Sequence, residues 1–78
     1  MLTLKDGQTF TGTDLQILRQ MQALSTLRDS SLDDYIAWMV GNVLEFDDVQ
    51  LAVIGDTEDA RAESLLGMLV MAGLAVRS

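Results

Sequence analysis

The side chains of this sequence that could do acid–base or ligand chemistry are almost all carboxylates. The 78 residues include 12 Asp and Glu, 5 Lys and Arg, and no His or Cys. Histidine and cysteine are the commonest general bases, nucleophiles and zinc ligands, so zinc sites, disulfides, thiol chemistry and Ser-His triads are all absent. What remains is chemistry that carboxylates do alone, which means a catalytic pair or a site for a hard cation.

Neither of these two carboxylate chemistries has its supporting residues. A glycosidase needs a cleft lined with aromatic side chains, and the chain has one Trp, one Tyr and two Phe. A calcium loop needs regularly spaced oxygen ligands around a central glycine. Asp47-Asp48 lacks such a continuation, and Arg61 stands where a loop beginning at Asp56 would need its glycine. We therefore predict a protein that binds rather than catalyses, with no metal and no cofactor.

The carboxylates are concentrated in the middle of the chain. The formal net charge is -7, and residues 29–63 hold most of the acids with Arg61 as their only cation. One interpretation is that they are helix N-caps and solvated helix faces. The other is a negative patch that meets a basic partner or imitates a row of phosphates. The candidate partner-binding acids are Asp33, Asp34, Glu45, Asp47 and Asp48.

The first dozen residues predict a β-hairpin. Asp6-Gly7 between β-forming residues is a strong turn signal. A three-residue loop with Gly7 in the left-handed conformation pairs Leu2 with Phe10 and places Leu4 on the same face. We prefer this register because a two-residue loop would give two mixed faces.

Helical periodicity and capping residues predict three helices after the hairpin. Thr13 followed by Gln16 has the form of a capping box, and Gly73 could serve as a left-handed C-cap. Between the last two helices, Val49 to Ile54 alternates, is rich in β-branched residues and is short, which favours a strand. The predicted elements are a hairpin over 1–12, helices over 13–28, 31–46 and 57–73, and a strand over 49–54.

This order of elements, ββααβα, predicts an α+β fold in a single compact domain over residues 1–78. The strands would form a small sheet with the helices on one side. The alternative is a small helical bundle in which residues 49–54 merely connect two helices. A chain of this length buries only about 60–65% of its unfolded surface, so packing, caps and oligomerisation must supply its stability.

Trp38 is the first candidate for a binding residue. At 100° per residue it lies about 200° from Ile36, the centre of the apolar stripe of its helix. It stands between Asp34 and Glu45 on that helix. One interpretation is that the hairpin or the strand covers the indole. The other is a hot spot for a partner protein, because Trp among small residues and peripheral charges is typical of an interface anchor.

The last predicted helix is apolar on all sides from Leu65 onward. Such a helix is either central to the monomer or buries its second face in a dimer. Methionine suits an adaptable interface. We expect a homodimer and name Met68, Met71 and Leu74 as the candidate contact residues.

Direct contact with nucleic acid or with a membrane is not expected. The helix over 31–46 contains no Lys or Arg, although a helix entering the major groove needs cations to position the phosphates. The longest apolar run, residues 65–76, is shorter than the roughly 20 residues that span a bilayer. The N-terminus lacks the basic and apolar regions of a signal peptide. We expect a cytoplasmic protein.

Two segments of the chain carry a resemblance. Leu2-Thr3-Leu4-Lys5-Asp6-Gly7 followed by Phe10-Thr11-Gly12-Thr13, and the Leu-Asp-Asp-Tyr sequence at residues 32–35, resemble short uncharacterised proteins of bacterial phages and mobile elements. The resemblance covers mainly the first twenty residues and implies no catalytic or binding residues. It does imply a setting in which small acidic proteins bind a host or phage protein. Anti-CRISPR inhibitors, some of which imitate DNA, are one such group.

The functional prediction is therefore a small acidic protein–protein interaction module. It would act as an inhibitor or adaptor that binds a basic protein surface, through Trp38 and the acids named above. One alternative is an antitoxin-like or transcriptional accessory that acts on DNA within a complex. Another is a structural subunit of a larger assembly.

Overall fold

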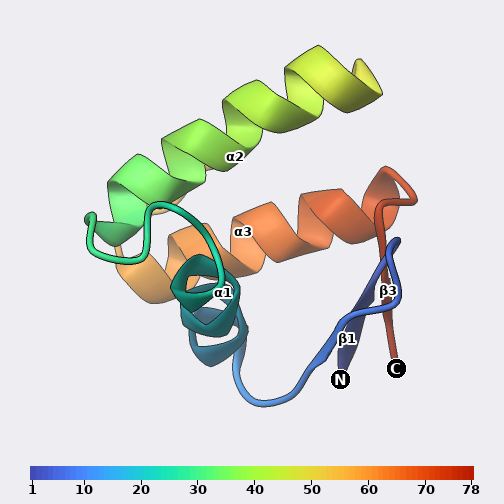
Figure 1. Ribbon diagram of the computed structural model, residues 1–78, viewed down its shortest axis with the longest axis horizontal. Coiled ribbons are helices and arrows are strands. Elements are labelled where there is room, and N and C mark those ends of the chain that lie inside the picture. Colours follow the sequence, from blue (N-terminus) through green and yellow to red (C-terminus); the bar gives the residue numbers. More distant parts are fainter.

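The two ends of the chain form a three-stranded antiparallel sheet. A computed structural model describes residues 1–78, with β1 (Leu2–Leu4), β2 (Thr9–Phe10) and β3 (Ala75–Arg77) in the order β2-β1-β3. The N- and C-terminal residues lie side by side (Figure 1), and the Ser78 N–H donates to the Met1 carbonyl at 2.9 Å. Together with the helices, this sheet confirms the predicted α+β class.

The predicted hairpin register is confirmed. Leu2 pairs with Phe10, and both side chains are buried. The Leu4 N–H donates to the Gln8 carbonyl at 2.8 Å, which leaves a three-residue loop. Gly7 in this loop has a φ of 96°, a conformation that costs glycine little because it has no Cβ. The loop length therefore keeps the apolar residues on one face, as the side-chain alternation required.

Three helices follow the hairpin, each with a hydroxyl N-cap. They are α1 (Asp14–Ala23), α2 (Leu32–Asp47) and α3 (Glu58–Met71). Thr13, Ser31 and Thr57 each accept a hydrogen bond from the backbone N–H three residues on. The predicted Thr13–Gln16 capping box makes both of its hydrogen bonds. Because the first N–H groups of a helix lack intrahelical partners, these caps fix where each helix begins.

Helix α1 ends five residues before its predicted boundary at residue 28. The Ser25 hydroxyl donates to the Gln22 carbonyl at 2.7 Å, which gives this carbonyl a partner outside the helical ladder. Leu24, which belonged to the predicted apolar stripe, is consequently 71% exposed. The residues beyond it form turns rather than helix.

Gln22 holds this connection between α1 and α2 together. Its side chain is buried, and its amide Nε2 donates to the carbonyls of Leu27 at 3.0 Å and Ser30 at 2.8 Å. A third carbonyl, that of Ser31, lies 3.3 Å away. One amide group thus supplies the hydrogen bonds that these turn carbonyls would otherwise obtain from water.

The predicted strand over residues 49–54 is wrong. No strand forms there, although Leu51 is buried and Val49 and Val53 are partly buried, as the alternation indicated. The third strand is β3, in which Ala75 pairs with Leu4 of β1. The alternation of apolar residues indicates which side chains face the core, whereas a strand also needs a neighbouring strand with which its backbone forms hydrogen bonds. The observed order is therefore ββαααβ rather than ββααβα.

A turn at the end of α3 delivers β3 to the sheet. Gly73, with a φ of 78°, follows the helix, so the predicted left-handed glycine is confirmed although α3 ends at Met71. The Leu74 N–H donates to the Leu69 carbonyl and the Gly73 N–H to the Val70 carbonyl, which is the Schellman pattern. The chain reverses here and runs beside β1.

All six elements contribute to one core. Leu2, Ile17, Leu18, Leu65 and Leu66 are its fully buried large side chains. Figure 1 shows α1 crossing α3 while α2 lies over both and diverges from α3 toward its C-terminal end. The Cα radius of gyration is 11.3 Å, against about 11.5 Å for a compact chain of this length. None of the helices has the length and apolarity needed to cross a membrane.

Candidate functional site

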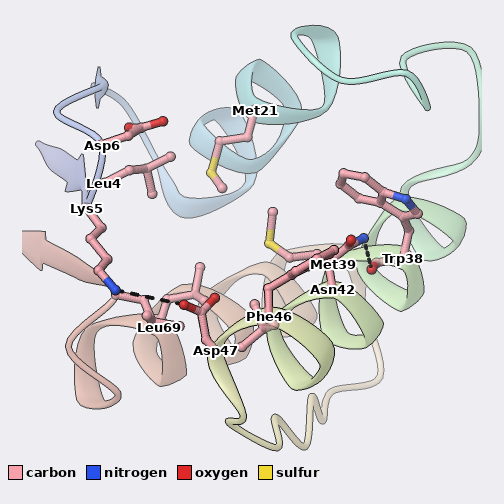
Figure 2. A pocket seen from close by; sticks show the side chains of 12 residues that line it. Leu4, Lys5, Asp6, Met21, Trp38, Met39, Asn42, Phe46, Asp47 and Leu69 are labelled. Carbon is pink, nitrogen blue, oxygen red and sulfur yellow. Dashed lines mark hydrogen bonds and ion pairs between the residues drawn. The ribbon is translucent and has the colours of Figure 1, made fainter.

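An open apolar groove of about 300 Å³ lies between α2 and the hairpin. We call it the α2 groove. Figure 2 shows its side chains converging from β1, α1, α2 and α3. Its apolar lining consists of Leu4, Met21, Trp38, Met39, Val43, Phe46, Leu69 and Leu74, and its polar lining of Lys5, Asp6, Asn42 and Asp47.

The floor of the groove is supplied by the core. Met21 of α1 and Leu69 of α3 are almost fully buried, and Met39 of α2 is partly buried. In Figure 2, Met21 and Met39 extend toward each other from their two helices. Because methionine has three flexible torsions and a polarisable sulfur, such a floor can adapt to the shape of a guest.

Trp38 forms one wall of the groove and remains 43% exposed. Its ring stacks on that of Tyr35 with centroids 5.8 Å apart and an interplanar angle of 25°. The Asn42 amide donates to the Trp38 carbonyl at 2.8 Å, one helical turn away. The indole is thus partly supported by a residue of its own helix and partly open to solvent.

Tyr35, beneath Trp38, is a neutral part of the core. Its side chain is 3% exposed, and desolvation by this burial raises the pKa of its phenol to about 12. The folded state therefore retains the proton at alkaline pH longer than the unfolded state does. This group contributes no pH dependence near neutrality, and it lowers stability only as the pH rises above about 10.

Phe46 is the groove residue that the sequence interpretation missed as a binding candidate. It is 75% exposed although it lies on the same side of α2 as Met39 and Val43. The length of the apolar stripe on this helix was a sequence signal that its last apolar residues extend beyond the core. The stripe runs to the last turn of a 16-residue helix, whereas the buried residues of α2 lie mostly in its first half.

The candidate acids do not form a single patch. Asp33 and Asp34 lie in the first turn of α2, while Glu45 and Asp47 lie in its last turn and Asp48 is its C-cap. At 1.5 Å per residue these two groups are about 20 Å apart along the helix. The predicted acidic flank is therefore divided between the two ends of α2.

Two of these acids already have partners in the monomer. Asp33 Oδ1 lies 2.9 Å from Arg61 Nε, and Asp47 Oδ1 lies 3.9 Å from Lys5 Nζ. The buried Arg61 Nε–H points at no acceptor, so its contact with Asp33 is an ion pair without a well-aligned hydrogen bond. Arg61 Nη1 also donates to the Gly55 carbonyl at 3.3 Å. Asp33 thus connects α2 to α3 and is a poor candidate for partner binding.

The C-terminal end of α2 carries the opposite charge from the one a helix end favours. A helix C-terminus has a partial negative charge that is stabilised by cations. The last turn of α2 contains no basic residue, and Glu45, Asp47 and Asp48 add three carboxylates. Asp48 also takes the left-handed conformation with a φ of 54°, which glycine adopts more easily. Lys5, whose side chain is 71% exposed, supplies the nearby compensation.

A second apolar surface lies on the other side of α3. We call it the α3 face, a shallow depression of about 500 Å³ whose apolar side chains Ile54, Met68 and Met71 surround Gly67. Glu63 and Ser64 add polar groups to its lining. Ile54 is 74% exposed and Met71 is 88% exposed. The dimer candidates Met68 and Met71 are therefore neighbours, whereas Leu74 lines the α2 groove instead.

No three carboxylates approach one another closely enough to hold a metal ion. No protein-family model, no curated protein and no solved structure matches the chain.

Proposed function

We propose that this protein is a protein–protein interaction module that binds a basic segment of another protein in the α2 groove. The observation that carries the proposal is the position of two exposed aromatic residues, Trp38 and Phe46, beside the acidic end of α2. Exposed aromatic anchors with charged surroundings are the usual centres of binding energy in protein interfaces.

Burial of the groove can supply a useful affinity. Full burial of a Phe side chain is worth about 1.5–3 kcal/mol, and Phe46 is still largely exposed. Trp38 adds its uncovered face, and the adaptable methionine floor allows close contact. Asp47, Asp48 and Glu45 favour a cationic partner and disfavour acidic proteins, which gives the site its selectivity.

The biological role we propose is that of an inhibitor or adaptor from a phage or mobile element. It rests on the resemblance of residues 1–20 and 32–35 and on the net charge of -7. For the alternative role as an antitoxin-like or transcriptional accessory, contact with DNA would have to come from the bound partner. Helix α2 offers no Lys or Arg for phosphate contacts.

Phe46→Asp is expected to abolish capture of the partner without disturbing the fold. Its side chain is 75% exposed, so the change removes little packing but places a charge at the apolar wall. The measurement is affinity purification from the source organism, with identification of bound proteins and a urea unfolding curve for each variant. Trp38→Ala should also abolish capture, but it costs stability because it removes the stacking on Tyr35.

The matched control is Leu24→Asp. Leu24 is 71% exposed and lies outside the α2 groove and the α3 face. The Leu24→Asp variant should capture the same partner as the unmodified protein. Retained capture by Phe46→Asp, or an acidic protein as the specific partner, would contradict the proposal.

A second proposal concerns self-association through the α3 face, which would serve either a homodimer or a subunit of a larger assembly. The supporting observation is the exposed apolar side chain of Met71 beside Gly67, whose missing side chain has no neighbour within 4 Å. Met71→Asp is expected to produce a monomer in sedimentation at concentrations where the unmodified protein is a dimer. Phe46→Asp, which changes the α2 groove, should leave the dimer intact. A monomeric unmodified protein at all concentrations would contradict this proposal, and higher oligomers would favour the assembly subunit.

A further inference from the structure

We infer that the element bound in the α2 groove is an amphipathic α-helix of the partner with basic residues at one end. This inference rests on the function proposed above and specifies the kind of partner. It follows from three features of the groove: its lining, its length and the distribution of charge around it.

The lining of the groove favours a helix over an extended segment. Its floor is made of Met21, Met39 and Leu69. Its polar residues are Lys5, Asp6, Asn42 and Asp47, and they do not form an exposed strand edge with which an extended peptide could pair. The Asn42 amide already donates to a backbone carbonyl of its own helix. An extended peptide would bury N–H and C=O groups without partners, whereas a helix satisfies its own.

The length of the groove fits two turns of a helix. Its wall on α2 extends from Trp38 to Phe46, which is about 12 Å along the helix axis at 1.5 Å per residue. Anchors at positions i, i+4 and i+7 of a guest helix span about 10.5 Å. These positions lie on one helical face, as in other recognition sites where a helix occupies a groove.

The charges fix the orientation of the guest. Glu45, Asp47 and Asp48 surround the negative end of the α2 dipole. A guest antiparallel to α2 places the positive end of its own dipole there, together with basic residues in its first turn. Figure 2 shows Lys5 reaching Asp47 from the hairpin at the rim of the groove. Lys5 therefore occupies the place where a guest cation would bind and competes with it.

A second copy of the chain does not offer a helix with free basic residues at one end. Helix α2 has no cation, and the single arginine of α1, Arg19, pairs with Glu58 of α3. Arg61 of α3 is committed to Asp33. A copy would also bring a further net charge of -7 against an acidic rim. The occupant is therefore a helix from a different, basic protein.

The test uses a designed peptide and the single tryptophan of the chain. The probe is a 14-residue peptide with leucines at i, i+4 and i+7, lysines in its first turn, and alanine and glutamine elsewhere. We expect a saturable blue shift of Trp38 fluorescence and a gain of peptide helicity in circular dichroism. One control peptide replaces the lysines by glutamates, and another places a proline at its centre. Both should bind at least on the order of tenfold more weakly.

Variants of the protein locate the bound peptide. Phe46→Asp should weaken binding by about 30-fold, whereas Ile54→Asp, at an equally exposed apolar position on the α3 face, should leave it unchanged. Asp47→Asn with Asp48→Asn should weaken binding about tenfold at low salt and reduce its salt dependence. Lys5→Gln should strengthen binding about threefold by removing the competing cation.

Equal binding of the proline or glutamate peptide would overturn the inference, as would the absence of a Trp38 response to the lysine peptide. Equal binding of the glutamate peptide would also contradict the basic partner of the proposed function. If only the proline control or the Trp38 response fails and partner capture still depends on Phe46, the proposed function stands and only the helical identity of the guest fails. If capture is also insensitive to Phe46, both fail.

Discussion

Replacement of Gln22 by glutamate is expected to lower the free energy of unfolding by about 3 kcal/mol at pH 7. The buried amide of Gln22 donates to the carbonyls of Leu27 and Ser30. A carboxylate of nearly the same shape would face those oxygens with no proton to donate. The turns between α1 and α2 would lose their hydrogen bonds, and a charge would be buried against partial negative charges.

The test of this prediction is urea unfolding at several pH values, with Gln20→Glu as the control. Gln20 lies on the same helix but is exposed, so its loss should be about 1 kcal/mol or less. Burial raises the pKa of the new carboxyl at residue 22 above its unfolded value. Folding then takes up a proton, and the lost stability is regained as the pH falls through the raised pKa. Equal losses at both positions, or no recovery in acid, would contradict the role given to Gln22.

Gly55→Ala is the second substitution with a large expected effect, a loss of about 2–3 kcal/mol. Gly55 has a φ of 142°, which L-residues rarely adopt. A Cβ at this position would lie 2.8 Å from the backbone nitrogen of Arg61 and 2.8 Å from the Ala60 Cβ. The segment before α3 would have to move, and the hydrogen bond from Arg61 to the Gly55 carbonyl would be lost with it.

A glycine-to-alanine substitution in α2 should raise the free energy of unfolding instead of lowering it. Gly41 lies inside the helix with no atom within 4 Å of a Cβ added there. Gly41→Ala should therefore raise stability by about 0.5–1 kcal/mol through helix propensity. Thermal unfolding measures both variants, since 1 kcal/mol corresponds to about 4–8 °C in a domain of this size. Similar midpoints for the two alanine variants would show that the segment at residue 55 adapts without cost.

The features predicted correctly from the sequence are those that a few neighbouring residues determine. The hairpin register follows from Asp6-Gly7 and from the need to place Leu2 and Phe10 on one face. The capping box at Thr13 and the left-handed Gly73 involve at most six consecutive residues. In each case the local geometry and the local sequence pattern require the same conformation, so tertiary structure had nothing to override.

The errors concern pairings between distant parts of the chain. Residues 49–54 have the alternation of a strand, and Leu51 does face the core. Whether such a segment becomes a strand depends on a free edge beside it, and the edge of β1 is taken by β3. The end of α1 was misplaced for a related reason. The hydrogen bonds of Gln22 and Ser25 to turn carbonyls have no periodic signature.

The candidate site was predicted in part. Trp38 was singled out by its position away from the apolar stripe, and it lines the α2 groove. Phe46 was overlooked because its exposure depends on how far α2 diverges from the hairpin and α3. The acids of α2 appeared as one group in the sequence, whereas the helix separates Asp33 and Asp34 from Asp47 and Asp48. In addition, Asp33 forms an ion pair with Arg61 of α3, which makes it a poor candidate for binding a partner.

The pairing of β1 with β3 also has a kinetic consequence. It joins Leu2 to Arg77 and Leu4 to Ala75, residues separated by almost the whole described chain. Contacts of such long sequence separation form slowly, whereas the hairpin and the three helices can form locally. During synthesis the edge of β1 therefore remains unpaired until residues 75–77 become available. For that interval the nascent protein carries an open strand edge, which leaves it vulnerable to pairing with the wrong strand.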